Sequence, residues 1–155
     1  MLNSRRFLSA CTLVVPWLTV PLIGKNTFLR FLPVATFVGY IFGFLSETAD
    51  NKKWWKVKNA LFPNHRLDVS YLLGLYLITT IWVFKLTFGN FYKYLTINII
   101  IDWLFSFPIV KFFTKVGVFE FKKMRPKHFF ILSVSMAIII YFYQALVEKV
   151  IKRAY

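Results

Sequence analysis

One acidic residue stands in the middle of a long apolar run, where a charged group needs a chemical reason. Asp102 lies at the centre of residues 94–110, with eight residues on either side. An aspartate at the centre of a membrane costs about 2.5 to 3.5 kcal/mol on insertion scales, and such residues face protein or water. Two interpretations follow: Asp102 couples protons or ions, or it forms a hydrogen-bonded structural contact between helices.

Asp102 belongs to a polar stripe that a second apolar run can match. Residues four apart share one helix face, and the two stripes are Asn98, Asp102 and Ser106 in the first run, and Ser133, Tyr141 and Gln144 in residues 129–147. We count inward from the outer ends of the two antiparallel runs. The expected pairs are Asn98 with Gln144, Asp102 with Tyr141, and Ser106 with Ser133 or Ser135. We predict a polar seam between these helices, with the Tyr141 hydroxyl or a trapped water near Asp102.

A second group of reactive side chains gathers at one membrane face. His65, Asp68 and His128 each fall just before, or at the mouth of, an apolar run that starts from the same side. Two imidazoles and a carboxylate could perform acid–base chemistry on a lipid headgroup. Their spacing matches no metal-binding or cofactor-binding motif, so we predict neither a metal nor a cofactor. The favoured interpretation is that Asn64 or Asp68 caps a helix, with no catalytic residue in the group.

The elements that position these residues are expected to be transmembrane helices. Of the 155 residues, 58% are hydrophobic, which is more than a soluble domain carries. Five continuous apolar runs reach the roughly 17 residues that a membrane-spanning helix needs, namely residues 7–23, 28–45, 69–88, 94–110 and 129–147. We predict a single all-α domain, a polytopic bundle over residues 1–155. The alternative is four spans, with the first two runs merged into a re-entrant hairpin.

Positive charge predicts the orientation of such a bundle. With five spans, the N-terminus, residues 46–68 and residues 111–128 share one side. That side holds 13 of the 20 Lys and Arg residues, namely Arg5, Arg6, Lys52, Lys53, Lys56, Lys58, Arg66, Lys111, Lys115, Lys122, Lys123, Arg125 and Lys127. Since basic loops stay in the cytoplasm, we expect the N-terminus inside and the C-terminus outside. Three basic residues near the C-terminus oppose this assignment.

Both basic loops also carry aromatic residues, which is typical of segments in the headgroup layer. Residues 50–62 are expected to form an amphipathic helix at the interface, and residues 111–127 repeat the pattern. The expected lipid-headgroup residues are Lys52, Lys53, Trp54, Trp55, Lys56, Lys122, Lys123, Arg125 and Lys127. The net charge of +14 is therefore assigned to anionic lipid rather than to nucleic acid.

Small residues mark a helix-packing face in the second run. Ala35, Gly39 and Gly43 recur every four residues, so another helix backbone can approach closely. The favoured partner is another helix of the same chain. A membrane-protein partner or a second copy is the alternative.

A short set of motifs resembles a known family. The Trp54–Trp55 pair, the run from Phe62 to His65 and Asp68 at the mouth of a span are similar to a family of small uncharacterised multi-pass membrane proteins of spore-forming Gram-positive bacteria. The resemblance covers residues 54–147. It implies a bacterial plasma membrane and no catalytic residue.

Three functions remain open at this point. The favoured one is a non-enzymatic structural or accessory subunit, or scaffold, in the plasma membrane. The alternatives are a small proton- or ion-coupled transporter using Asp102 and, second, a lipid-headgroup enzyme at the cytoplasmic edge. The single cysteine, Cys11, excludes an intrachain disulfide.

Overall fold

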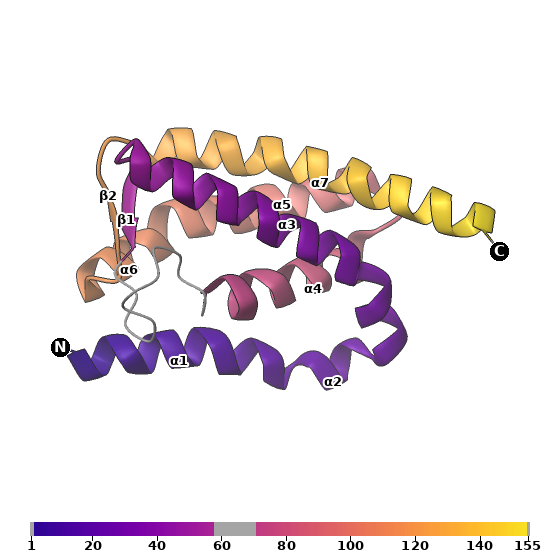
Figure 1. Cartoon of the computed structure of the whole chain (residues 1–155), viewed down its shortest axis with the longest axis horizontal. Coiled ribbons are helices and arrows are strands. Elements are labelled where there is room, and N and C mark those ends of the chain that lie inside the picture. Colours follow the sequence, from indigo (N-terminus) through magenta and orange to yellow (C-terminus); the bar gives the residue numbers. More distant parts are fainter. Residues whose placement is uncertain (1, 58–70, 155) are drawn as a thin grey trace.

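The computed structural model of the chain describes residues 2–57 and 71–154, and the side chains from residue 6 to 56 and 71 to 153. It is mostly helical, and four of its helices are long and apolar enough to cross a membrane. The elements are α1 (Leu2–Leu18), α2 (Val20–Ile23), α3 (Lys25–Asn51), β1 (Trp55–Val57), η1 (Tyr71–Tyr76), α4 (Leu77–Thr87), α5 (Phe91–Leu104), η2 (Phe105–Ile109), α6 (Val110–Val116), β2 (Phe119–Phe121) and α7 (Pro126–Ala154). Figure 1 shows them as an elongated bundle.

The first apolar run forms two helices instead of one. Pro16 and Pro21 lack the N–H that a continuous helix requires, and the chain breaks at Thr19 between α1 and α2. The indole of Trp82 donates to the Thr19 hydroxyl at 2.9 Å and so fixes this break against α4. Gly24 then reverses the chain with a φ of 84°, which favours glycine. The first two runs therefore form two antiparallel helical segments, each long and apolar enough to cross a membrane.

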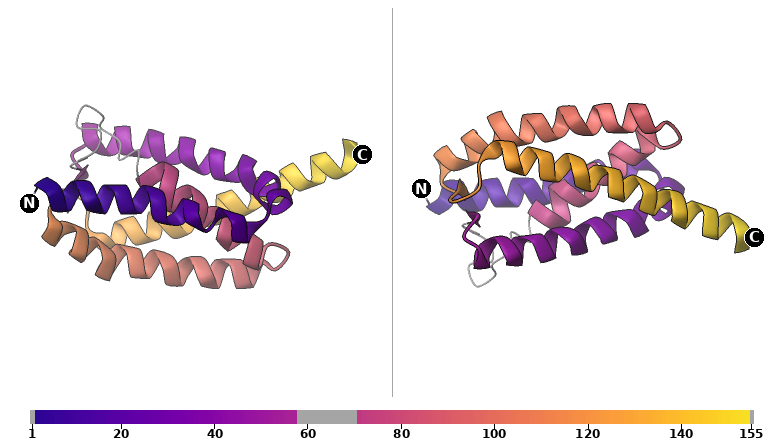
Figure 2. Two further views of the ribbon diagram at one scale, coloured as in Figure 1. Left: turned by 90° about the horizontal axis from the view of Figure 1, so that it is seen from below. Right: turned by 90° about the horizontal axis from the view of Figure 1, so that it is seen from above.

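The described part of the third apolar run lies in the centre of the bundle. It consists of the π-helical turn η1 followed by α4, from Tyr71 to Thr87. It packs on α1, α3 and α5 (Figure 2). Ile78, Ile81 and Phe84 are almost fully buried, as expected for a helix that is apolar on every side.

The last two runs form helices longer than the sequence indicated. The fourth continues from Phe91 to Val116 through η2, whose π-helical turn contains Pro108. The fifth, α7, extends to Ala154 and projects beyond the other helices (Figure 1). Each helix continues through polar residues at both ends of its apolar run, because the run marks only the part of the helix that lipid would cover. The N-terminus and the C-terminus lie at opposite ends of the bundle.

A two-stranded ribbon closes the end of the bundle that holds the N-terminus, which we call the ribbon end. β1 pairs antiparallel with β2, and Lys56 lies opposite Glu120. The predicted interfacial helix over residues 50–62 is therefore wrong in its described part. α3 continues to Asn51, and the aromatic and β-branched residues that follow form a strand because a complementary strand, β2, lies beside them. Likewise, residues 111–127 form α6, β2 and the start of α7.

The close approach between helices occurs at Gly74 and not at Gly39 or Gly43. A Cβ atom built on Gly39 or Gly43 would meet no described atom within 4 Å, so neither residue brings two helices together. At Gly74, a Cβ would overlap the Thr12 carbonyl oxygen and lie 2.5 Å from the Leu13 Cα. Only a residue without a side chain lets η1 cross α1 at this distance. Of the predicted stripe, Ala35 alone is buried.

Candidate functional site

Asp102 faces an internal cavity between the central helix, α5 and α7. The cavity around it has a small inner part of about 30 Å³ and a larger adjoining part of about 250 Å³. The two parts share Asp102 and five further residues, namely Tyr76, Thr80, Val83, Asn98 and Ser133. The Asp102 Oδ2 atom is buried and has no hydrogen-bond partner among the described residues. An unpaired buried carboxyl oxygen is costly, so its position needs an explanation.

Three hydrogen-bond donors around Asp102 bind backbone oxygens. The Tyr94 hydroxyl donates to the carbonyl oxygen of Ala137 at 3.0 Å. The Thr80 hydroxyl donates to a backbone oxygen one turn earlier on its own helix, at 2.8 Å. The Asn98 side-chain amide donates to the backbone oxygen of Tyr94, also at 2.8 Å. These contacts satisfy backbone acceptors and leave the carboxyl unpaired.

The basic residues considered as counterions of Asp102 also have other partners. Lys85 Nζ donates to the carbonyl oxygen of Leu22 at 2.7 Å and lies 4.9 Å from the centre of the Trp82 ring. The Lys85 side chain therefore turns toward α2 and not toward Asp102. Arg30 pairs with Glu148. Asp102 therefore has no counterion within the part of the chain that the structure describes.

The polar seam has a different register from the one that depth counting predicted. Tyr141 packs on Tyr94, with 4.9 Å between the ring centroids. Tyr94 precedes Asp102 by eight residues, or ~12 Å of helix. The α7 residues that line the inner part of the cavity with Asp102 are Ser133, Ala137 and Ile140, and Tyr141 is not among them. The pairing of Asp102 with Tyr141 is wrong. Because α7 continues beyond its apolar run, counting from the end of that run shifted the predicted α7 partner of Asp102 by about two helical turns.

The other members of the predicted seam are separated. Ser106 is buried on η2, and its Oγ atom has no hydrogen-bond partner among the described residues. Ser135 is exposed and donates to the backbone oxygen of Ile131 on its own helix. Gln144 is fully buried, but it lies beside Arg30 rather than Asn98. Only Asn98, Asp102 and Ser133 meet in one cavity.

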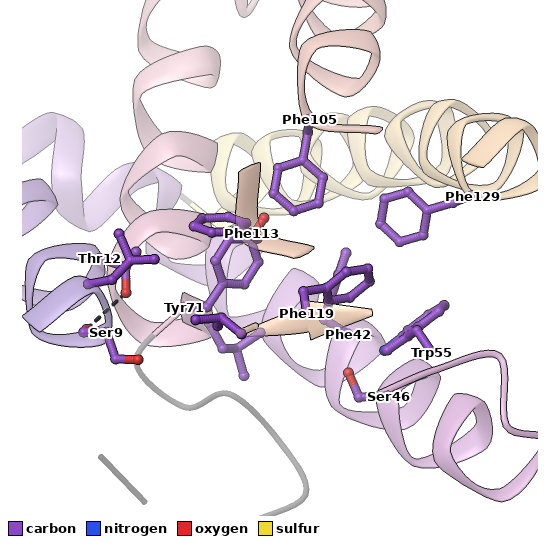
Figure 3. A pocket seen from close by; sticks show the side chains of 13 residues that line it. Ser9, Thr12, Phe42, Ser46, Trp55, Tyr71, Phe105, Phe113, Phe119 and Phe129 are labelled. Atoms are coloured by element: carbon purple, nitrogen blue, oxygen red, sulfur yellow. Dashed lines mark hydrogen bonds between the residues drawn. The ribbon is translucent and has the colours of Figure 1, made fainter. Parts of the chain in front are cut away.

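An arc of aromatic rings connects the Asp102 cavity to the ribbon end. Phe42, Tyr76, Tyr71, Phe105 and Phe129 contact one another in this order, with ring centroids 4.1 to 5.9 Å apart. Four of these rings, all except that of Tyr76, also line a second cavity of about 70 Å³ beneath the ribbon (Figure 3). The two cavities share this aromatic wall. Both π-helical turns contribute to it, and such turns are frequent at functional sites.

The opposite side of Asp102, toward the C-terminal end of the bundle, is packed with aromatic rings. Phe84 contacts Phe31 and Tyr94, and Phe91 contacts Tyr141, with centroids 5.0 to 5.6 Å apart. These rings come from α3, α4, α5 and α7 and fill the space between them. The cavity is therefore extended toward the ribbon end and blocked toward the other.

An ion pair that the sequence did not predict lies next to this aromatic packing. The Arg30 guanidinium on α3 binds Glu148 on α7 through two hydrogen bonds of 2.5 and 2.9 Å. The Gln144 amide donates to Glu148 at 3.3 Å and to the backbone oxygen of Arg30 at 3.4 Å. A usable signal was present in the sequence: Glu148 continues the polar stripe of α7, and Arg30 lies at the same end of an antiparallel neighbour.

The predicted histidine group lies mostly outside the described residues. His65 and Asp68 belong to residues 58–70, so their relation to His128 is not part of the described structure. His128 is exposed in the first turn of α7, and its backbone N–H donates to the Arg125 carbonyl oxygen at 3.0 Å. No group of three metal-ligating side chains occurs within residues 2–57 and 71–154.

The predicted headgroup residues gather at the ribbon end, with one exception. The backbone N–H groups of Lys122 and Lys123 donate to the carbonyl oxygens of Trp54 and Lys53, which brings the two basic loops together. The exposed basic side chains there are Lys52, Lys53, Lys56, Lys122, Lys123, Arg125 and Lys127. Trp55 is the exception. Its side chain is 6% exposed and packs edge-on against Phe129, so it belongs to the core beneath the ribbon.

Comparisons with protein-family models, curated proteins and solved structures find no match to this chain. The resemblance to small membrane proteins of spore-forming bacteria stays a prediction. The function is therefore inferred from the site around Asp102.

Proposed function

We propose that this protein is a small multi-pass plasma-membrane carrier that binds and releases a proton or a cation at Asp102. The observation that carries the proposal is the unpaired carboxyl oxygen of Asp102 at the wall of a 250 Å³ cavity. A structural contact between helices would use that oxygen as a hydrogen-bond acceptor. Three neighbouring donors, on Thr80, Tyr94 and Asn98, instead bind backbone oxygens, which favours a ligand-binding role over a structural one.

The cavity has the asymmetry that a carrier needs. It extends along aromatic rings toward the ribbon end and is blocked by packed rings and the Arg30–Glu148 pair at the other. A carrier exposes its site to one side at a time, near the middle of the bilayer. This arrangement corresponds to a state in which Asp102 is separated from the side opposite the ribbon end.

We also propose an orientation with the ribbon end in the cytoplasm. The exposed basic side chains of both loops gather there, and positive charge is retained on the cytoplasmic side during insertion. These lysines and arginines lie at the depth of anionic lipid headgroups, which they attract. The C-terminal end of α7 then lies outside.

Transient currents after a pH jump test the proposal, because proton binding at Asp102 moves charge within the membrane even without a transported substrate. Proteoliposomes adsorbed on a solid-supported membrane should give a transient current with the wild-type protein. Asp102→Asn removes the titrating group but keeps its size, so the current should disappear. Glu47→Gln is the matched control, because Glu47 is an exposed acid on α3, and its current should equal that of the wild type. An undiminished current in Asp102→Asn would overturn the proposal.

A second candidate function is that of an accessory subunit or scaffold, and one observation favours it. Gly39 and Gly43 have no described neighbour within 4 Å of a Cβ position, so the small face of α3 remains open to another membrane helix. Gly43→Leu would obstruct that face without touching the Asp102 cavity. Loss of a stoichiometric partner or of a second copy after purification in mild detergent would support this role, and a wild-type monomer in several detergents would contradict it.

A further inference from the structure

We infer that the ligand of Asp102 is a lipophilic organic cation carrying an aromatic ring, which enters the cavity from the lipid. This inference deepens the proposed function, on which it rests, by naming the chemical class of the ligand. It depends on the size of the cavity, the nature of its walls, the place where it opens and the charge of the one acid inside it.

The size of the cavity fits a small organic molecule better than a bare ion. A cavity of about 150 Å³ lined by aliphatic and aromatic side chains binds benzene in another protein. The larger part of the Asp102 cavity has about 250 Å³, enough for an aromatic ring together with a substituted ammonium group. A proton or a metal ion would leave most of that volume unused.

The walls combine the two features that recognise an organic cation. Aromatic faces attract ammonium groups through their quadrupoles, more strongly where water is excluded. Phe42, Tyr71, Tyr76, Phe105 and Phe129 supply five such rings around the cavity. Asp102 supplies the single carboxyl among the described residues that line it. An apolar body bearing a positive charge is therefore complementary to both.

The opening of the cavity favours entry from the lipid phase. Leu104 and Ile109, from α5 and η2, line the cavity and are also 42% and 38% exposed on the outside of the bundle. Apolar side chains at that depth of a membrane-spanning helix face lipid. A hydrophilic cation coming from the ribbon end must instead pass the exposed lysines and arginines there, which repel it.

Binding exchanges one proton for one cation. A buried carboxyl group without a counterion is least costly in its neutral form, so cation binding leaves a carboxylate beside the cation and releases the proton to solvent. The other titratable groups at the cavity are Tyr76 and Tyr71 on η1 and Tyr94 on α5. The residues contributed by α3, α4 and α7 include Val38, Val83 and Ser133, and none of these titrates.

Calorimetry with a cation and its neutral counterpart tests the inference. The probe is benzyltrimethylammonium, and neopentylbenzene has the same shape without the charge. Purified protein in detergent should bind the cation, and titrations in buffers of different ionisation enthalpy should give one proton released per cation. Wild-type affinity should fall about tenfold for each pH unit toward acid, by linkage. Asp102→Asn should weaken binding at least tenfold, and Glu47→Gln should leave it unchanged.

Three results would overturn the inference: equal affinity for neopentylbenzene, undiminished binding by Asp102→Asn, or binding without proton release. The pH dependence of the wild-type protein keeps the test valid if the Asp102 variant does not fold. A pH-jump current that depends on Asp102, in a protein that does not bind benzyltrimethylammonium, would contradict the ligand class alone. Absence of that current in the wild type would contradict the proposed function itself.

Discussion

Gly74 differs from the other helix glycines at the scale of a single residue, because it meets another backbone. Its missing side chain allows the carbonyl oxygen of Thr12 and the Cα of Leu13 to approach η1. Gly74→Ala should force α1 away from the central helix and lower the free energy of unfolding by about 2 kcal/mol, the usual cost of overpacking. Equilibrium unfolding of the purified protein in mixed micelles with increasing SDS would measure the change.

Gly39 provides the matched control for this substitution. A Cβ there meets no described atom within 4 Å, and alanine is the better helix former by up to about 1 kcal/mol. Gly39→Ala should therefore leave the protein as stable as the wild type or slightly more so. Equal losses at both positions would show that α1 does not cross the central helix at Gly74.

The chemistry-bearing residue could be found from the sequence, but its neighbours could not. Asp102 is conspicuous as an acid in the middle of an apolar run, and the structure places it at the wall of an internal cavity. Its contacts depend on the register in which α7 packs along α5, and no local sequence pattern determines that register. For this reason Ser133 was found on the stripe but paired with the wrong residue, and Tyr141 was assigned to Asp102.

At the scale of elements, the apolar runs predicted the helices but not their ends. A run records the part of a helix that lipid would cover, whereas α3 and α7 continue through polar residues to Asn51 and Ala154. The ribbon could not be predicted at all, since β1 and β2 are three residues each and lie far apart in the sequence. Only their pairing in the folded chain makes them strands.

The pair of Arg30 and Glu148 is predicted to connect α3 to α7 energetically. Two parallel hydrogen bonds join these side chains, which are 50% and 15% exposed. A double-mutant cycle with Arg30→Ala and Glu148→Ala should give a coupling energy of about 1 kcal/mol. Arg30→Lys should recover only part of it, because an ammonium group cannot form the two-pronged contact.

The same SDS unfolding measurement would supply the free energies for this cycle. A control pair is available at the ribbon end, where Lys122 and Glu120 form a single contact with both side chains about 45% exposed. Additive effects of Arg30→Ala and Glu148→Ala, with no coupling energy, would contradict the connection between the two helices.

The whole molecule is asymmetric along its axis. The basic loops, the ribbon and the aromatic cavity occupy one end, and the packed rings occupy the other. The charge count of the sequence anticipated this difference, and the pairing of the loops explains it, since the ribbon holds both basic segments together. The aromatic wall shared by the two cavities could not be predicted from the sequence, because its residues come from helices far apart in the chain.

The proposed orientation predicts where fused reporters become active in bacterial cells. Alkaline phosphatase fused to the C-terminus should be active, and green fluorescent protein at the same place should be dark, because both report the outer side. Fusions placed after Lys123, in the ribbon end, should show the reverse. Fluorescence from the C-terminal fusion would contradict an external C-terminus and indicate an even number of spans.

The central claim is that Asp102 is a neutral, unpaired carboxyl reached through the cavity, and its direct test is labelling with dicyclohexylcarbodiimide. This apolar reagent adds to protonated carboxyl groups and leaves a stable N-acylurea. Mass spectrometry of treated membranes should find the modification on Asp102, slowed by prior addition of benzyltrimethylammonium, and not on the exposed Glu47. An unmodified Asp102, in protein that retains its fold, would contradict the account.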